Sequence, residues 1–299
     1  MPTGLATSAR RSWTSCSLVT LLFRIRHGKI MAIPRIDWAA LPAAVQDAVE
    51  THTGPVLHAD TASAGDNSAV AATLHTRAGR VFAKGIPTDH RQVWTQHEEA
   101  RINPHVLAIA PRLLWQVETG GWHLLGFEHV AGRHADYSPG SPDLPAVAEA
   151  VRAVNGIPCP DLPIKAMSQR LAEFASDPAD LRLLDGDSLL HTDFAPHNVL
   201  ITGRGALVVD WAWPTRGPAW VDVAVAAMRL MGAGHTVIQA EAWADQFPVW
   251  QTAPRRAVDV FVTLSARLWR QVSCGNPRPW SVRLAAASGQ WADHLAYRV

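Results

Sequence analysis

Hydrophobic positions in the first half of the chain form short apolar runs separated by glycine-containing turns. Turns of this kind at residues 77–79 and 120–121 are typical of β-hairpins. The predicted strands are residues 68–76, 80–84, 112–118 and 121–130. Residues 88–102 have a helical pattern instead, with Thr88 or Asp89 as the expected cap. This half of the chain therefore predicts a small α+β lobe with one helix.

From about residue 131 the apolar pattern lengthens to helical spacing. The predicted helices are residues 144–154, 166–175, 221–230, 257–272 and 282–297. A short β insertion at residues 189–213 interrupts them, and the stretch 132–145, rich in proline and glycine, predicts a loop between the two parts. We expect an N-lobe over residues 31–130 and a mainly helical C-lobe over residues 131–299.

Residues 1–30 differ from the rest. Arg10-Arg11 and the apolar stretch 18–23 superficially resemble an export signal, but the stretch is short and is followed directly by arginines. We expect a dispensable leader, with folding information starting near Met31; an export signal is the alternative.

Composition narrows the class of protein. The 299 residues are 48% hydrophobic and 18% charged with a net charge of +1, which indicates a folded protein and gives no electrostatic case for nucleic acid. Three widely spaced cysteines suggest neither a disulfide framework nor a zinc site, and they favour a cytoplasmic location. No segment approaches the ~18 consecutive apolar residues of a membrane span.

The β insertion holds the most informative polar residues. Apolar runs at residues 199–202 and 206–209 surround Gly203-Arg204-Gly205, which predicts a tight hairpin centred on Arg204. That register places Asn198 opposite Asp210, with Cβ atoms ~4.5–5.5 Å apart. Amide and carboxylate oxygens suit Mg²⁺, so the pair is a candidate metal site, and Asp193 is a third carboxylate for the same cleft.

Two alternatives remain at this point. Asn198 and Asp210 could simply terminate a hairpin, although the longer run of spaced polar residues favours a functional site. His191, Asp193 and His197 could instead bind zinc, but their spacing matches no zinc pattern.

The sequence His191-Thr-Asp193-Phe-Ala-Pro-His-Asn198, followed by Asp210-Trp211, resembles the aminoglycoside phosphotransferase family. These are small-molecule kinases that share the protein-kinase fold. The resemblance implies that Asp193 accepts or orients the substrate hydroxyl, and that Asn198 and Asp210 hold the metal ions on the nucleotide phosphates. It also implies that His191 braces the loop.

Asp222 resembles the family's later buried aspartate, which supports the catalytic loop; a helix N-cap is the alternative. Asp210 is followed by Trp211-Ala212 where protein kinases have Phe-Gly, which favours the small-molecule branch.

Lys84 is the candidate phosphate-binding amine. It is one of only three lysines among 27 basic residues, and it ends a predicted strand beside the apolar Phe82. A compact ammonium acts on phosphate as a point charge, which arginine reproduces poorly. Its expected carboxylate partner is Glu99 on the following helix, with Glu98 as the alternative.

The remaining nucleotide contacts are expected from position. The loop preceding the first hairpin has small residues that let backbone N–H groups approach phosphate, namely Ser63, Gly65, Asn67 and Ser68; an ordinary turn is the alternative. By analogy with the hinge of kinase-fold proteins, the Glu128 carbonyl and the Val130 amide would bond the adenine edge.

We therefore expect an α+β, bilobal, protein-kinase-like enzyme that uses Mg²⁺ and ATP, or GTP in its place, to phosphorylate a hydroxyl of a small molecule, with an antibiotic among the candidates. Residues 240–299 hold four acids and seven arginines, which does not suit a polycationic aminoglycoside unless the acid-rich residues 136–187 supply the carboxylates of its pocket. The alternatives are a metabolic kinase for an amino alcohol or sugar, and a non-catalytic nucleotide-binding pseudokinase. The oligomeric state is not predicted.

Overall fold

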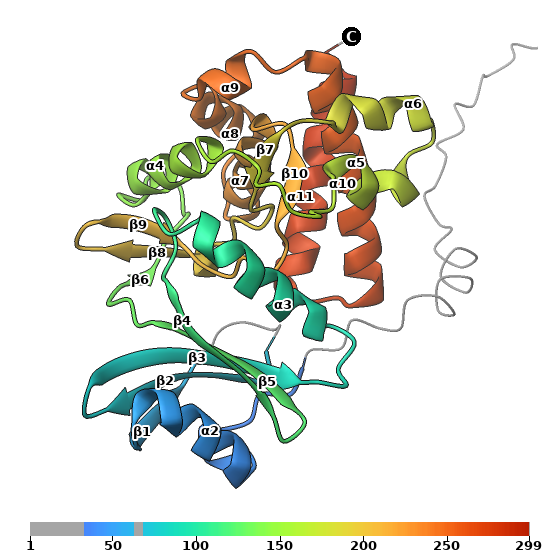
Figure 1. Cartoon of the computed structure of the whole chain (residues 1–299). Coiled ribbons are helices and arrows are strands. Elements are labelled where there is room, and N and C mark those ends of the chain that lie inside the picture. Colours follow the sequence, from blue (N-terminus) through green and yellow to red (C-terminus); the bar gives the residue numbers. More distant parts are fainter. Residues whose placement is uncertain (1–32, 63–67, 299) are drawn as a thin grey trace, which may run out of the picture.

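The computed structural model describes residues 33–62 and 68–298 (Figure 1). The leader expected at residues 1–30 lies outside them. A five-stranded sheet with two helices forms the N-lobe, and a mainly helical C-lobe follows it. The predicted α+β architecture is thus confirmed. None of the helices in the described part of the chain combines the length and apolar character needed to cross a membrane.

The N-lobe sheet is antiparallel, with strand order β1-β2-β3-β5-β4. Its strands are β1 (Val56–Thr61), β2 (Val70–Thr76), β3 (Gly79–Pro87), β4 (Leu113–Thr119) and β5 (Trp122–Glu128). Both predicted hairpins are present. Gly120 and Gly121 form the β4–β5 turn with φ of +56° and +79°, a conformation that glycine adopts without steric cost.

Two helices lie on the N-lobe sheet. Helix α2 (Ala43–Thr53) packs Val45 and Val49 into the core on one side, and the sequence analysis did not predict it. Helix α3 (Val93–Ile102) lies between the sheet and the C-lobe (Figure 1). It begins five residues later than predicted. Neither Thr88 nor Asp89 caps it, because the Thr88 N–H instead bonds the Gly121 carbonyl and residues 88–92 form turns.

The C-lobe contains the predicted helices together with shorter ones. They are α4 (Leu144–Asn155), α5 (Met167–Leu171), α6 (Pro178–Leu181), α7 (Trp220–Gly232), α8 (Val237–Ala244), α9 (Pro248–Gln251), α10 (Arg255–Gly275) and α11 (Pro279–Ala296). The helix predicted at residues 166–175 is divided into α5 and a 3-10 turn, and α8 was not predicted. Helix α7 forms the centre of the lobe: ten of its 13 residues are buried.

The β insertion lies against the cleft between the lobes. Strands β6 (Arg133–His134), β8 (Val199–Thr202) and β9 (Gly205–Val208) form one small sheet, and β7 (Ser188–Leu190) pairs with β10 (Thr215–Gly217) in another.

The predicted hairpin is present, but its predicted register is wrong by one residue. Thr202 pairs with Gly205 and Val199 with Val208, so Gly203 and Arg204 form a two-residue turn and Asn198 lies opposite Val209 rather than Asp210. A two-residue turn is the commonest hairpin connection. A slip of one residue would normally turn one of the two polar side chains to the other face of the sheet.

Candidate active site

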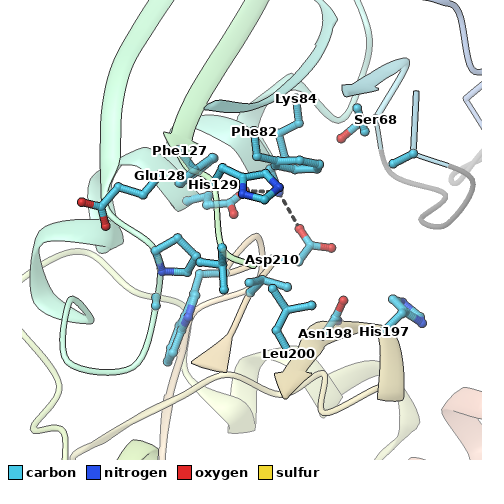
Figure 2. Close-up of a pocket in the computed structure, with 18 of the residues that line it drawn as sticks. Ser68, Phe82, Lys84, Phe127, Glu128, His129, His197, Asn198, Leu200 and Asp210 are labelled. Carbon is cyan, nitrogen blue, oxygen red and sulfur yellow. Dashed lines mark hydrogen bonds and ion pairs between the residues drawn. The ribbon is translucent and has the colours of Figure 1, made fainter. Parts of the chain in front are cut away.

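A cavity of about 260 Å³ opens between the two lobes, and residues of both lobes line it (Figure 2). Its wall includes apolar side chains of both sheets, such as Phe82, Phe127 and Leu200. Polar groups gather at one part of the wall: Lys84, Glu99, Asn198 and Asp210. An apolar cleft with a few converging polar groups is the usual form of a small-molecule site.

Lys84 connects the two lobes within this cavity. Its Nζ lies 2.8 Å from Asp210 Oδ1 and also forms an ion pair with Glu99. Burial lowers the pKa of Lys84, but the negative charges of Asp210 and Glu99 outweigh burial and raise it above its usual value. The two carboxylates therefore favour the charged ammonium and hold it between the lobes.

The structure also shows which of the two candidate glutamates faces Lys84. Glu99 is buried and pairs with it, whereas Glu98 pairs with Arg101 at the helix surface. Burial raises the pKa of Glu99 to about 7. The negative charge of Asp210 adds to this increase, and the positive charge of Lys84 opposes it.

Asn198 and Asp210 both face the cavity although they are not paired across the hairpin (Figure 2). Asp210 has a left-handed backbone conformation with φ of +64°, which is uncommon outside glycine and redirects the chain at the end of β9. Asn198 lies in a 3-10 turn, Pro196–Asn198, just before β8. These two departures from strand geometry compensate for the shifted register, so the two side chains share one cavity.

The oxygen atoms of this pair fit a hard cation. The Asn198 Nδ2 donates to the Asp193 carbonyl at 3.0 Å, which leaves its Oδ1 free to act as a ligand. Asp210 uses Oδ1 for Lys84 and retains Oδ2. An amide oxygen and a carboxylate oxygen are ligands that Mg²⁺ accepts.

The loop from His191 to Asn198 is held by hydrogen bonds along its length. The His191 ring donates from Nε2 to the Val209 carbonyl at 3.0 Å and accepts the Asp193 N–H at Nδ1. Burial lowers the pKa of His191, in keeping with this neutral form. Both ring nitrogens are thus occupied, which excludes the alternative of His191, Asp193 and His197 as zinc ligands.

Asp222 in the first turn of α7 holds the start of this loop. Its two oxygens accept the N–H groups of His191 and Thr192, each at 2.8 Å. Thr192 has a φ of +65°, so the loop begins with a strained residue that these bonds stabilise. Burial raises the pKa of Asp222 to about 7, although both N–H bonds oppose the shift.

Replacing Asp222 by alanine should lower the free energy of unfolding by about 2–4 kcal/mol, because two buried N–H groups lose their acceptors at about 1–3 kcal/mol each. Chemical denaturation measures this loss. Asp259, exposed on α10, gives the matched control Asp259→Ala, which should change stability little. An Asp222→Ala chain as stable as the parent would remove Asp222 from the loop's support.

One residue beside Asp193 was not predicted from the sequence. Arg229 of α7 donates from Nη2 to Asp193 Oδ1 at 2.6 Å, and its guanidinium lies 5.4 Å from the centre of the Trp269 ring. Arg229 follows Asp222 by seven residues, which is close to two helical turns, so both point to the same loop. The available signal was an arginine in a helix whose residues, apart from Asp222, are otherwise apolar.

The expected nucleotide contacts divide into two groups. Ser68, Glu128 and Val130 line the cavity, and the Glu128 side chain pairs with Arg112 outside it. Ser63, Gly65 and Asn67 lie outside the described residues.

Comparison with known proteins bears on the family and the fold. A family model described as the phosphotransferase enzyme family matches residues 137–257, which include the loop, the hairpin and α7. No curated protein matches the chain. The family match confirms the predicted resemblance over these residues and the predicted enzyme class of phosphotransferase.

Solved structures share the fold at low identity. Aminoglycoside phosphotransferase APH(4)-Ia is 17% identical with a TM-score of 0.58, over 85% of this chain and 98% of that one. Choline kinase LicA from Streptococcus pneumoniae is 11% identical with a TM-score of 0.59, over 84% and 98%. APH(3'')-Id from Streptomyces rimosus ATCC10970, solved with ADP and streptomycin, is 16% identical with a TM-score of 0.53, over 74% and 96%. The predicted kinase-like fold is confirmed.

Proposed function

We propose that this chain, whose residues 137–257 match the model of the phosphotransferase enzyme family, transfers the γ-phosphoryl group of ATP to a hydroxyl of a small molecule with the help of Mg²⁺. The observation that supports this proposal is the convergence of one ammonium and two metal-type oxygen donors, Lys84, Asn198 and Asp210, at a single cleft, with the Asp193 backbone hydrogen-bonded to Asn198 beside it. Phosphoryl transfer depends on positioning and charge neutralisation, which these groups supply.

The nucleotide would occupy the cavity between the lobes. The apolar walls of Phe82, Phe127 and Leu200 suit a base, and the Lys84 ammonium suits the α- and β-phosphates. The structural neighbours include a thermostable mutant of APH(4)-Ia in a ternary complex with AMP-PNP and hygromycin B. The oxygens of Asn198 and Asp210 would hold Mg²⁺, whose charge neutralises the phosphates as the bond to the leaving ADP breaks.

Asp193 would act on the acceptor. Its Oδ1 is held by Arg229, so Oδ2 remains to accept the hydroxyl proton while the acceptor oxygen forms its bond to the γ-phosphorus. The bond between that phosphorus and the bridging oxygen of ADP breaks in the same step. The Asp193 backbone is held by two hydrogen bonds: its carbonyl accepts from the Asn198 Nδ2, and its N–H donates to the His191 Nδ1.

Arg229 favours a neutral or anionic acceptor over a polycation. Its guanidinium contacts the aspartate that the acceptor hydroxyl must reach, so a polyamine bound there would face like charge at close range. A sugar or a neutral hydroxylated antibiotic meets no such repulsion. The second candidate function is a metabolic kinase of the same fold. For such a kinase a neutral sugar is a better acceptor than a cationic amino alcohol, because the amino alcohol would be repelled by Arg229.

The proposal is tested by ADP release with ATP and Mg²⁺ over a panel of neutral macrolides, sugars, amino alcohols and aminoglycosides. We expect Mg²⁺-dependent turnover with at least one neutral acceptor and weaker turnover with aminoglycosides. A chain that binds ATP and Mg²⁺ but turns over none of the panel would contradict the proposal and favour the pseudokinase.

Replacing Arg229 by methionine should lower kcat for a neutral acceptor by about 10–100-fold, because an imprecisely positioned catalytic group is costly. The KM for ATP should stay unchanged, since Arg229 does not line the nucleotide cavity. Arg229→Lys should restore part of the rate. Arg255, exposed at the start of α10, gives the control Arg255→Met. Equal kcat in Arg229→Met and parent would contradict the positioning role.

A further inference from the structure

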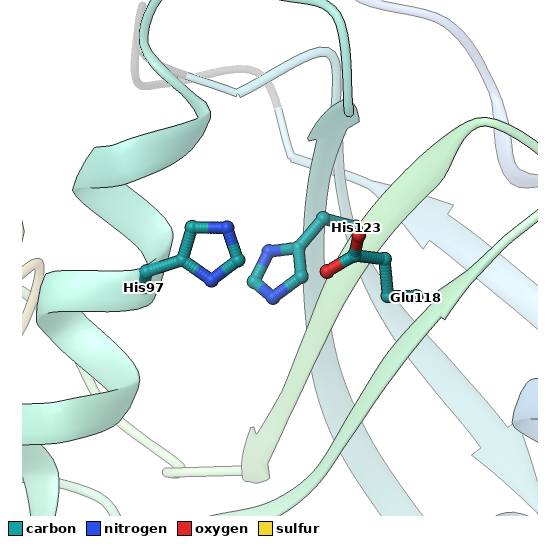
Figure 3. Close-up of side chains that lie close together, drawn as sticks. All are labelled: His97, Glu118 and His123. Atoms are coloured by element: carbon teal, nitrogen blue, oxygen red, sulfur yellow. The ribbon is translucent and has the colours of Figure 1, made fainter.

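A second group of ligand-type side chains lies in the N-lobe, outside the nucleotide cavity. His97 on α3 points toward His123 on β5, and Glu118 lies on the neighbouring strand β4 (Figure 3). One ligand atom from each of the three residues lies within 4.8 Å of the others. Among residues 33–62 and 68–298, these are the residues whose His, Cys, Asp and Glu atoms gather closely enough to hold a metal ion.

The backbone brings the three residues together. Glu118 and His123 are direct partners across the β4–β5 hairpin, so their side chains share one face of the sheet. Helix α3 packs on that face, and the rings of His97 and His123 have centroids 4.3 Å apart. The three residues therefore come from three adjacent elements and converge on one point.

Hydrogen bonds fix His123 in the form that binds a metal. The Gln96 Oε1 can only accept, so His123 Nδ1, at 3.1 Å, carries the proton. Nε2 then has a free lone pair, and at present it accepts from the Gln116 Nε2 at 2.8 Å. A metal-bound histidine usually donates its other ring N–H in this manner, which sets the orientation of the ring.

A metal ion could replace the Gln116 contact at low cost. Gln116 is exposed, so its amide can bond water once it is displaced, whereas His123 is fully buried and stays in place. His97 and Glu118 are exposed and can each adjust their rotamers toward the same point.

We propose that His97, Glu118 and His123 form a site for a divalent transition-metal ion, with Zn²⁺ as the ion that fits best. Two imidazoles and one carboxylate are a common zinc ligand set, and a tetrahedral ion leaves the fourth position for water. The ion would tie α3 to β4 and β5. It is separate from the Mg²⁺ site, and the inference does not depend on the proposed transfer activity.

Zn²⁺ bound at His97, Glu118 and His123 would hold α3 against the sheet. His97 and Glu99 are two residues apart, about 200° around the helix, so they leave nearly opposite sides of α3. Glu99 pairs with Lys84 of β3, while His97 lies against His123 of β5, so α3 contacts the same face of the sheet at both residues. Binding of Zn²⁺ should therefore stabilise the N-lobe around the helix that carries Glu99.

The test is a Zn²⁺ titration of the full chain without a histidine tag, in competition with a chromogenic chelator and with excess Mg²⁺ to saturate the catalytic cleft. We expect one tight equivalent per chain and a tetrahedral visible spectrum when Co²⁺ replaces Zn²⁺. Saturating Zn²⁺ should raise the thermal midpoint by about 5 °C.

His97→Ala should weaken Zn²⁺ binding at least about 100-fold. Loss of a residue that only hydrogen-bonds to a metal ligand already costs about 10–100-fold in affinity, and His97 is proposed as a ligand itself. It should also abolish the thermal shift. His97 is exposed, so this variant should fold, and Glu118→Gln should weaken binding to a smaller extent. The matched control is His105→Ala, an exposed histidine just beyond α3. Absence of stoichiometric binding, or equal binding by His97→Ala and parent, would overturn the site.

Discussion

Replacing Asp193 by alanine should lower turnover by about 10²–10⁴-fold, the usual contribution of a general base. Nucleotide affinity should change little, because Asp193 contacts Arg229 and the loop rather than the cavity wall. The loss should fall on kcat, since the acceptor hydroxyl no longer has a proton acceptor at the reacting oxygen. Steady-state kinetics and titration with a non-hydrolysable ATP analogue measure the two quantities separately.

Asp161→Ala is a suitable control for this variant, because Asp161 is an exposed carboxylate of the same lobe. Removing Asp193 leaves Arg229 without its carboxylate partner, so a thermal midpoint should be recorded for each chain. Unchanged turnover in a folded Asp193→Ala chain would remove Asp193 from the mechanism.

Replacing Asp210 by alanine should abolish the Mg²⁺ dependence of nucleotide binding and lower turnover by at least about 10³-fold. Asp210 supplies the carboxylate of the oxygen pair, and Asn198 alone is a weak neutral ligand. Loss of an electrostatic contact at the developing charge typically costs about 10²–10³-fold, and the metal contributes further. Lys84 keeps its pair with Glu99, so the amine should stay charged.

Calorimetric titration with a non-hydrolysable ATP analogue, with and without Mg²⁺, checks this result. The Asp193→Ala chain is the internal comparison, because its Mg²⁺ dependence should be intact. An Asp210→Ala chain whose metal titration matches that of the parent would contradict the assignment of Asp210 as a metal ligand.

The features that the sequence predicted well depend on local patterns. The Gly120-Gly121 turn is encoded by the positive φ that glycine tolerates, and the helical spacing in residues 144–154 is visible within that segment alone. The run from His191 to Asn198 is likewise compact, so its resemblance to a family could be recognised directly.

The features that the sequence did not reveal depend on distant contacts. Asp193 and Arg229 are 36 residues apart, and only the packing of α7 beneath the loop brings them together. The register of the β8–β9 hairpin depends on the length of its turn. The glycines at positions 203 and 205 suit a turn of two residues, which the structure has, as well as one of three. Helix α2 has only two apolar residues larger than alanine to signal it, Val45 and Val49, and these are its buried residues.

Lys84 combines a feature that the sequence predicts with contacts that only the fold reveals. Scarcity of lysine drew attention to Lys84, and the structure places that residue between Glu99 and Asp210. Glu99 is the expected partner of Lys84 and Glu98 the alternative; the structure pairs Glu99 with Lys84, because the two glutamates leave different sides of the same helix.

The central claim is that this cleft moves a phosphoryl group onto a small-molecule hydroxyl. The most direct test is mass spectrometry of the acceptor. The parent and the Asp193→Ala chain are each incubated with the acceptor, ATP and Mg²⁺ at equal nucleotide occupancy. We predict that the parent adds one phosphoryl group to the acceptor and that Asp193→Ala forms this product at least about 100-fold more slowly. An acceptor left unmodified by the parent, or modified equally by both chains, would contradict the claim.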